Sequence, residues 1–523
     1  MTHPTGSVPA PATIAAHPAT TGTAARDVTD VPRPAGGPMA AIRRLRADPL
    51  TQLAEVHREH GPIVRLASWP VSAFLVSDPD AIADALVGGH RLYAKGAVVR
   101  GPGSRATVTQ PLALLLGQGL LTSAGDTHLR QRRLIQPLFH KQRLAGYGEQ
   151  FVALADAAAA GWRDGQPLDL HAEMTEMTLA IVARTLFDVD LSDRVVDVVR
   201  AAVGENMPAA RRAVLPAFER LERLPLRATR RRQESRAALD RAVYEMIAAR
   251  RAARLDDADG DGRDGGGGGT DLLSLLLAAR DADTGERMDD TQIRDEAMTL
   301  LLAGHETTAN ALAWTFHLLG GAPDVAARLH AEIDTVLDDR PPTIDDLPRL
   351  PYAGAVFSES MRLYPPVWAM GRHLVADREV AGYLLPAGST LVFSPWVVHR
   401  DERWWPDPDR FDPTRWLEPT GTTTMTDATA PTAGRCPVEA GAGASSRKAA
   451  GAQGRPRFAY FPFGGGPRQC IGNSFAVAEG VLTLATITRR WSFTPASDAP
   501  VTPEPLVTLR PKAGLPMTAH RRR

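Results

Sequence analysis

The chain has 523 residues, with 60 Lys and Arg residues against 60 Asp and Glu residues, and 44% of its residues are hydrophobic. This composition is typical of a globular protein with a sizeable core, which excludes a disordered or fibrous chain. A net charge of zero gives no overall field that would attract nucleic acid or an acidic membrane, so we expect no nucleic-acid partner.

The hydrophobic pattern predicts a mainly α fold with a small β-sheet region. Apolar residues recur at helical spacing in long windows rich in Ala, Leu and Arg, and short runs of β-forming residues lie apart from them. In chain order, we predict strands at residues 63–66 and 73–76, helices at 149–161, 194–203, 235–255 and 292–319, and a strand at 390–393.

Three stretches have the composition of tails or linkers. Residues 1–37 are rich in Pro, Ala and Thr, residues 256–270 contain five consecutive glycines, and residues 421–454 are dominated by Thr, Ala, Gly and Ser. We therefore expect a disordered tail at 1–37, a flexible linker at 256–270 and a low-complexity insertion at 421–454.

The sequence predicts a soluble, cytoplasmic protein without a membrane anchor. Two cysteines, Cys436 and Cys470, are too few for a disulfide framework, which favours a reducing compartment. The N-terminus lacks the basic start and continuous apolar stretch of a secretory signal. The most apolar segment, residues 300–319, contains His305 and Glu306, which a membrane-spanning helix would avoid.

The helix predicted at 292–319 has a polar centre, Ala303-Gly304-His305-Glu306-Thr307-Thr308. Buried polar groups need a reason. A zinc-protease motif would require a second histidine at position 309, which is Ala309. Two interpretations remain: a small residue lets a ligand approach while an acid beside a hydroxyl relays protons, or the helix is bent with internally satisfied hydroxyls.

Near the C-terminus, residues 463–472 read Phe-Gly-Gly-Gly-Pro-Arg-Gln-Cys-Ile-Gly. Backbone N–H groups turned toward Cys470, together with the start of the following helix, would favour a thiolate over a thiol. A single cysteine excludes structural zinc and iron–sulfur clusters, but haem iron accepts one axial cysteinate. Arg468 would then suit a haem propionate.

This loop resembles that of the cytochrome P450 family of haem-thiolate monooxygenases, F-G-x-G-x-R-x-C-x-G. The fixed positions are matched by Phe463, Gly464, Gly466, Arg468, Cys470 and Gly472. The resemblance implies that Cys470 is the metal ligand of haem b (iron protoporphyrin IX) and that the other five residues bind this cofactor.

The polar centre of the predicted helix resembles the family's A-G-x-[DE]-T-T segment. The resemblance implies that Glu306 and Thr307 are the catalytic residues that supply protons to dioxygen. It also implies that Ala303 and Gly304 leave space beside the cofactor for oxygen and substrate.

Other segments resemble the family's supporting residues. Glu359 and Arg362 match an E-x-x-R pair, and Arg410, in Pro-Asp-Arg-Phe, resembles the arginine that completes this structural triad. His128 and Arg132, four residues apart on one predicted helix face, resemble haem-propionate partners. Arg372 resembles a further propionate arginine.

The resemblance covers residues 40–516 and implies a single-core cytochrome P450 fold, with one monooxygenase domain at 38–523. It implies insertion of one oxygen atom from O₂ into a hydrophobic small molecule by hydroxylation or epoxidation, in a monomer that takes electrons from a separate ferredoxin and ferredoxin reductase. We expect terpenoid or polyketide tailoring in secondary metabolism. A fatty-acid hydroxylase, a peroxide-driven or non-oxygenating relative and a non-catalytic haem sensor or binding protein are the alternatives.

Overall fold

The structure is a computed structural model, and it describes residues 25–68, 72–95, 97–99, 107–109, 112–188, 193–212, 224, 226–259, 271–280, 285–417 and 455–522. The insertion expected at 421–454, with Cys436, lies outside the described residues. So do residues 1–24 of the expected tail and residues 260–270 of the expected linker.

Helices dominate the described chain, as the sequence predicts. They are α1 (Gly37–Ala47), α2 (Pro49–His60), α3 (Pro79–Ala83), α4 (Ala113–Leu116), α5 (Gly125–Ile135), α6 (Lys141–Ala160), α7 (Leu170–Phe187), α8 (Asp193–Arg212), α10 (Arg227–Asp259), α11 (Leu272–Ala278), α12 (Asp290–Gly320), α13 (Pro323–Leu337), α14 (Pro351–Leu363), α15 (Pro395–Val398) and α16 (Asn473–Arg490).

The strands form small sheets. They are β1 (Ile63–Ala67), β2 (Ala73–Val76), β3 (Tyr93–Ala94), β4 (Ala97–Val99), β5 (Thr107–Thr109), β6 (Gln166–Asp169), β7 (Met370–Leu374), β8 (Arg378–Val380), β9 (Tyr383–Leu385), β10 (Thr390–Phe393), β11 (Trp491–Pro495), β12 (Pro503–Pro505), β13 (Leu509–Pro511) and β14 (Pro516–Arg521). The largest sheet has the order β1-β2-β10-β7-β3, in which β10 runs parallel to β2 and antiparallel to β7.

The strands predicted at 63–66, 73–76 and 390–393 are confirmed as β1, β2 and β10, and the four predicted helices fall on α6, α8, α10 and α12. Two predicted boundaries differ from the structure. Val31 is only 2% exposed and the amide of Arg26 donates to the carbonyl of Gly382, so residues 26–31 pack onto the sheet region, although the sequence predicts a tail there. Residues 256–259 continue the helix α10.

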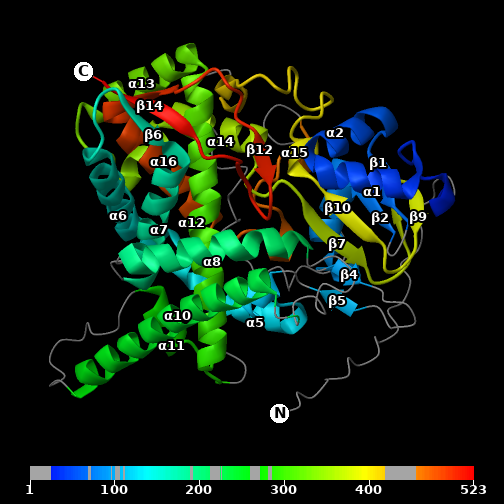
Figure 1. The fold of residues 1–523 in the computed structure, drawn as a ribbon, viewed down its shortest axis with the longest axis horizontal. Helices are drawn as coiled ribbons and strands as arrows, with labels where there is room; N and C mark the ends of the chain where they lie inside the picture. Colours follow the sequence, from blue (N-terminus) through cyan, green and yellow to red (C-terminus); the bar gives the residue numbers. More distant parts are fainter. Residues whose placement is uncertain are drawn as a thin grey trace.

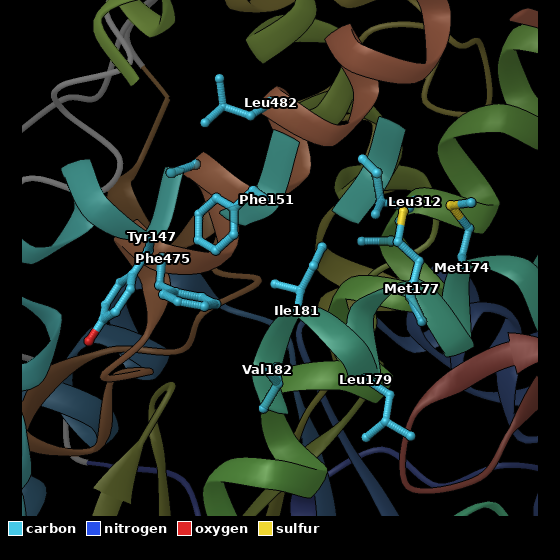
Figure 2. Close-up of a cluster of buried hydrophobic side chains, with 14 of the residues drawn as sticks. Tyr147, Phe151, Met174, Met177, Leu179, Ile181, Val182, Leu312, Phe475 and Leu482 are labelled. Carbon is cyan, nitrogen blue, oxygen red and sulfur yellow. The ribbon is translucent and has the colours of Figure 1, made fainter. Parts of the chain in front are cut away.

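Helix α12 passes through the helical part of the molecule, and the five-stranded sheet lies to one side of it (Figure 1). The main core forms where α6, α7, α12 and α16 meet. Phe475 of α16 packs edge-on against Phe151 and Tyr147 of α6, with ring centroids 4.8 and 5.6 Å apart (Figure 2). This packing fixes α16, and with it the loop that carries Cys470, relative to α6.

Candidate functional site

The loop before α16 folds tightly around Cys470. The amide of Cys470 donates to the carbonyl of Phe463 at 2.9 Å. Gly464 and Gly466 have φ values of 68° and 67°, a region that side chains rarely enter. A Cβ on Gly466 would lie 1.8 Å from the carbonyl oxygen of Leu86, so only glycine allows this approach. The glycines therefore set the loop that presents the sulfur at the start of α16.

Cys470 lies deep in the protein yet keeps accessible surface. Burial raises the pKa of its thiol, while the amide of Gly472 and the charge of Arg132 lower that pKa. The sequence predicts that groups around Cys470 favour the thiolate, and the amide of Gly472 and the charge of Arg132 act in this direction. The effect of burial on the pKa is larger, so the protein alone does not favour the thiolate. A metal cation bound at this sulfur would favour the thiolate, because a coordinating thiol loses its proton.

Positively charged side chains from distant parts of the chain converge near this loop. Arg132 of α5 donates to the carbonyl of Gln469 at 2.7 Å, and Arg468 donates to the carbonyl of Ser123 at 2.7 Å. Burial lowers the pKa values of Arg372 and Arg468 to about 10. Burial, together with the charges of Arg468, Arg132, Lys95 and Arg372, lowers the pKa of His128 to about 3. The predicted propionate partners thus form one cluster.

Lys95 is a member of this cluster that the sequence analysis missed. Its ammonium group donates to the carbonyl of Leu121, and burial with the charges of Arg468 and Arg372 lowers its pKa to about 7. Every charged neighbour that shifts the pKa of Lys95 or His128 is another cation. No motif around Lys95 indicates its role, because the fold alone brings it to Arg468 and Arg372.

The centre of α12 is buried on most sides but keeps accessible surface at Ala303 and Thr307, which lie one turn apart. The hydroxyl of Thr307 donates to the carbonyl of Ala303 at 2.7 Å. Glu306 is 8% exposed, and its Oε1 accepts a hydrogen bond from the hydroxyl of Thr508 at 2.6 Å. An acid and an accessible alcohol are therefore adjacent in the chain, each with a separate partner.

Gly304 also has a contact that the sequence does not predict. A Cβ on Gly304 would lie 3.0 Å from Cγ2 of Val182 on α7, so this glycine allows α7 and α12 to pack closely. Gly304 is half-buried, as Thr307 is, and Ala303 is exposed. That Ala303 and Gly304 leave space for oxygen and substrate stays a prediction.

Glu359 and Arg362 form the expected pair on α14. Arg362 donates from Nε and Nη2 to the two carboxylate oxygens of Glu359 at 2.9 and 2.8 Å, and both side chains are fully buried. Arg362 also donates to the carbonyls of His399, Pro408 and Arg410. This geometry ties α14 to the loop that follows α15.

The assignment of Arg410 as the third member is wrong. Arg410 is exposed and contributes only its backbone carbonyl. The guanidinium of Arg415 takes the predicted place, with Nε 3.3 Å from Oε1 of Glu359, and Trp416 donates to the other oxygen at 2.9 Å. The chain turns through a short 3₁₀-helix at Pro413–Trp416, which directs Arg415 inward and leaves Arg410 outside.

A comparison with protein families matches residues 30–517 to the family described as cytochrome P450. The chain belongs to the cytochrome P450 family. It is similar to a solved cytochrome P450DA heme domain, with a TM-score of 0.75 and 26% identity over 94% of this chain and 98% of that one. This cytochrome P450 therefore has the family's single-core fold.

Three relatives of this cytochrome P450 come from Streptomyces species. Cyclooctatin synthase of Streptomyces melanosporofaciens is 37% identical over 91% of this chain and 92% of its own length. Cyclooctat-9-en-7-ol 5-monooxygenase of the same organism is 35% identical over 91% and 90%. Pentalenene oxygenase of Streptomyces avermitilis is 36% identical over 86% and 88%. This cytochrome P450 is a monooxygenase that acts on a hydrophobic substrate with O₂ and external electrons.

The residues of the site fit a haem-thiolate cofactor. Cys470 offers one accessible sulfur, and the buried cluster of Lys95, His128, Arg132, Arg372 and Arg468 matches the two negative propionates that the cofactor carries. Nη1 of Arg468 is buried without a hydrogen-bond partner among the described residues, and a propionate oxygen would satisfy it. Among all the residues that the structure describes, no helix is long and apolar enough to cross a membrane.

Proposed function

We propose that this monooxygenase hydroxylates or epoxidises a cyclic terpenoid in secondary metabolism. The observation that carries this proposal is the similarity, at 35% and 36% identity over about nine-tenths of each chain, to oxygenases whose names specify cyclooctat-9-en-7-ol and pentalenene. None of the three relatives' names specifies a polyketide or a fatty acid.

The cofactor in this proposal is haem b, which supplies the activation of dioxygen. Sγ of Cys470 would hold the iron, and the loop residues Phe463, Gly464, Gly466 and Gly472 would form the protein surface next to the cofactor. Arg132, Arg372 and Arg468, with Lys95, would bind the propionates. His128 would donate a ring N–H to the same groups.

In this proposal Glu306 and Thr307 move protons. The accessible hydroxyl of Thr307 would hold a proton for the reacting oxygen, and the carboxyl of Glu306, the preceding residue, would replace that proton. Ala303 lies one turn away on the same face, where its small side chain leaves room for substrate.

We propose a ferredoxin and its flavoprotein reductase as the electron donors, and a monomeric cytoplasmic enzyme. The bacterial relatives support a donor of this class. The surface near Cys470 also fits a small acidic protein, since α5 presents the basic Arg133 beside Leu129, which is 46% exposed.

The first test is the carbon monoxide difference spectrum of the dithionite-reduced protein. We expect a strongly red-shifted Soret band from cysteinate ligation, which Cys470→Ala abolishes. A histidine-type band in folded wild-type protein would overturn the ligand assignment. Cyclooctat-9-en-7-ol, pentalenene and, for comparison, lauric acid are then added stepwise to the oxidised enzyme. The absorbance spectrum shows whether each compound converts the haem iron from low spin to high spin. A response to lauric acid alone would overturn the terpenoid assignment.

A further inference from the structure

The carboxyl of Glu306 is held by a segment some two hundred residues further along the chain. Thr508 lies between β12 and β13, and its hydroxyl donates to Oε1 of Glu306 at 2.6 Å. Glu306 and Thr508 are only 8% and 5% exposed. A hydrogen bond between groups shielded from water is stronger than the same bond at the surface, so it fixes the direction of the carboxyl.

The β12–β13 hairpin is itself anchored by several hydrogen bonds. Trp314, two turns after Glu306 on α12, donates to the carbonyl of Leu509 at 3.0 Å. Trp368 donates to the carbonyl of Leu506 at 2.9 Å, and the amide of Leu509 donates to the carbonyl of Pro366 at 2.9 Å. Thr508 is therefore a rigid anchor for the carboxyl, because the residues on both sides of it are fixed.

Other polar groups lie near Glu306 but interact with its carboxyl only through their charge, without the direct contact that Thr508 makes. His171 of α7 hydrogen-bonds to Asn310 at 2.9 Å, one turn after Glu306 on α12. Burial lowers the pKa of His171, while the charges of Asp169 and Glu306 raise it and that of Arg510 lowers it. These groups set the field around the acid, whereas Thr508 makes the direct contact that sets its position.

We propose that Thr508 is a positioning residue that holds the Glu306 carboxyl in place for proton transfer on the accessible side of α12. This inference rests on the proposed role of Glu306. Without the hydroxyl, the carboxyl loses its fixed orientation while the backbone of α12 and of the hairpin stays in place. Proton supply then becomes less efficient, although haem binding and folding are retained.

The test uses the haem-loaded enzyme and the stretching band of carbon monoxide bound to the reduced haem, measured by infrared spectroscopy. This band responds to the charges and dipoles on the side of the haem that α12 covers, and it needs neither substrate nor redox partner. Thr508→Val removes the hydroxyl at nearly constant volume, Thr508→Ser retains it, and Glu306→Gln marks the effect of the acid itself.

The matched control is Thr315→Val. Thr315 is a fully buried threonine of α12 whose hydroxyl donates only to the carbonyl of Ala311 in its own helix, at 2.7 Å. Midpoints of thermal unfolding, measured in parallel, report any general loss of packing that accompanies either valine substitution.

We expect Glu306→Gln to shift the band, Thr508→Val to shift or broaden it, and Thr508→Ser and Thr315→Val to leave it as in the wild type. A band unchanged in Thr508→Val overturns the proposal, as does a band unchanged in Glu306→Gln, since the carboxyl then lies out of reach of the haem. Equal changes in Thr508→Val and Thr315→Val also overturn it. The proposed function fails separately, through loss of the cysteinate Soret band in the wild type.

Discussion

Thr307 offers the accessible alcohol of α12 and donates its proton to the carbonyl of Ala303. We predict that Thr307→Ala still binds haem and substrate but releases most electrons as hydrogen peroxide. General acid–base groups contribute about 10²–10⁴-fold to their steps, so the ratio of product to consumed reductant falls at least about tenfold. The measurement compares product, peroxide and reductant in the same reaction.

Two further variants separate this chemistry from packing. Thr307→Ser keeps the hydroxyl and restores most of the coupling. Thr315→Ala removes an equivalent back-bonded threonine two turns away and leaves the coupling unchanged. If Thr307→Ala forms product with the wild-type ratio, the proposed proton transfer does not pass through this residue.

Lys95 shows why single residues of the site escape sequence analysis. A lysine is normally exposed, and its neighbours Tyr93 and Ala94 look like any short strand. The pairing of β3 with β7 brings Lys95 near Arg372, and the loop before α16 brings Arg468 near the same lysine. A role that depends on charges from three distant segments leaves no local pattern.

At the scale of elements, the 3₁₀-helix at Pro413–Trp416 completes the buried ion pair of α14. We predict that Arg415→Leu lowers the free energy of unfolding by about 1.5–3 kcal/mol, because it removes a charged hydrogen bond from the buried Glu359. Haem retention falls as well, since this contact joins α14 to the chain that leads to the cysteine loop. Urea unfolding and the ratio of Soret to protein absorbance measure the two effects.

Arg410→Leu is the matched control, because Arg410 is exposed and contacts the ion pair only through its backbone carbonyl. We expect its stability to stay within about 0.5 kcal/mol of the wild type. An equal loss of stability in both variants would show that the contact with Glu359 is not what stabilises this segment.

Elements that depend on local spacing are the ones that the sequence predicts well. Glu359 and Arg362 share one helix face, and the glycines around Cys470 meet a backbone requirement within the same loop. Arg415 and Gly304 are different, since the direction of a loop and the approach of α7 decide their roles. Tertiary packing, which no single segment contains, therefore explains why the sequence predicts Arg410 in the place of Arg415 and why it does not predict the contact of Gly304 with α7.

At the scale of the whole molecule, the N-terminal half of α12 binds the loop that leads to α5. Oε2 of Glu296 accepts a hydrogen bond from the amide of Leu120 at 2.8 Å, and Asp295 accepts one from the amide of Gln118 at 2.7 Å. The same loop supplies the carbonyl of Ser123 to Arg468. The contacts of this loop with α12 therefore also position Arg468, which belongs to the cationic cluster of the candidate haem site.

This junction makes the stability of the enzyme depend on pH. Burial raises the pKa of Glu296 to about 8, opposed by the amide of Leu120 and aided by the charge of Asp295. Because the folded state holds this proton more tightly than the unfolded state, the contribution is fully present below the unfolded pKa of about 4.5 and is lost as pH rises through about 8.

Glu296→Gln mimics the protonated acid and cannot ionise, so we predict that it removes this loss. Unfolding by urea at pH 6 and pH 9 should show the free energy of the variant falling less than that of the wild type, by about 1.4 kcal/mol for each unit of the pKa difference that lies in this range. Glu286→Gln, at a side chain that is 69% exposed, should retain the wild-type pH dependence. A parallel fall in Glu296→Gln and in the wild type would show that Glu296 is already ionised at pH 6, and that the loop before α5 is held by a charged carboxylate.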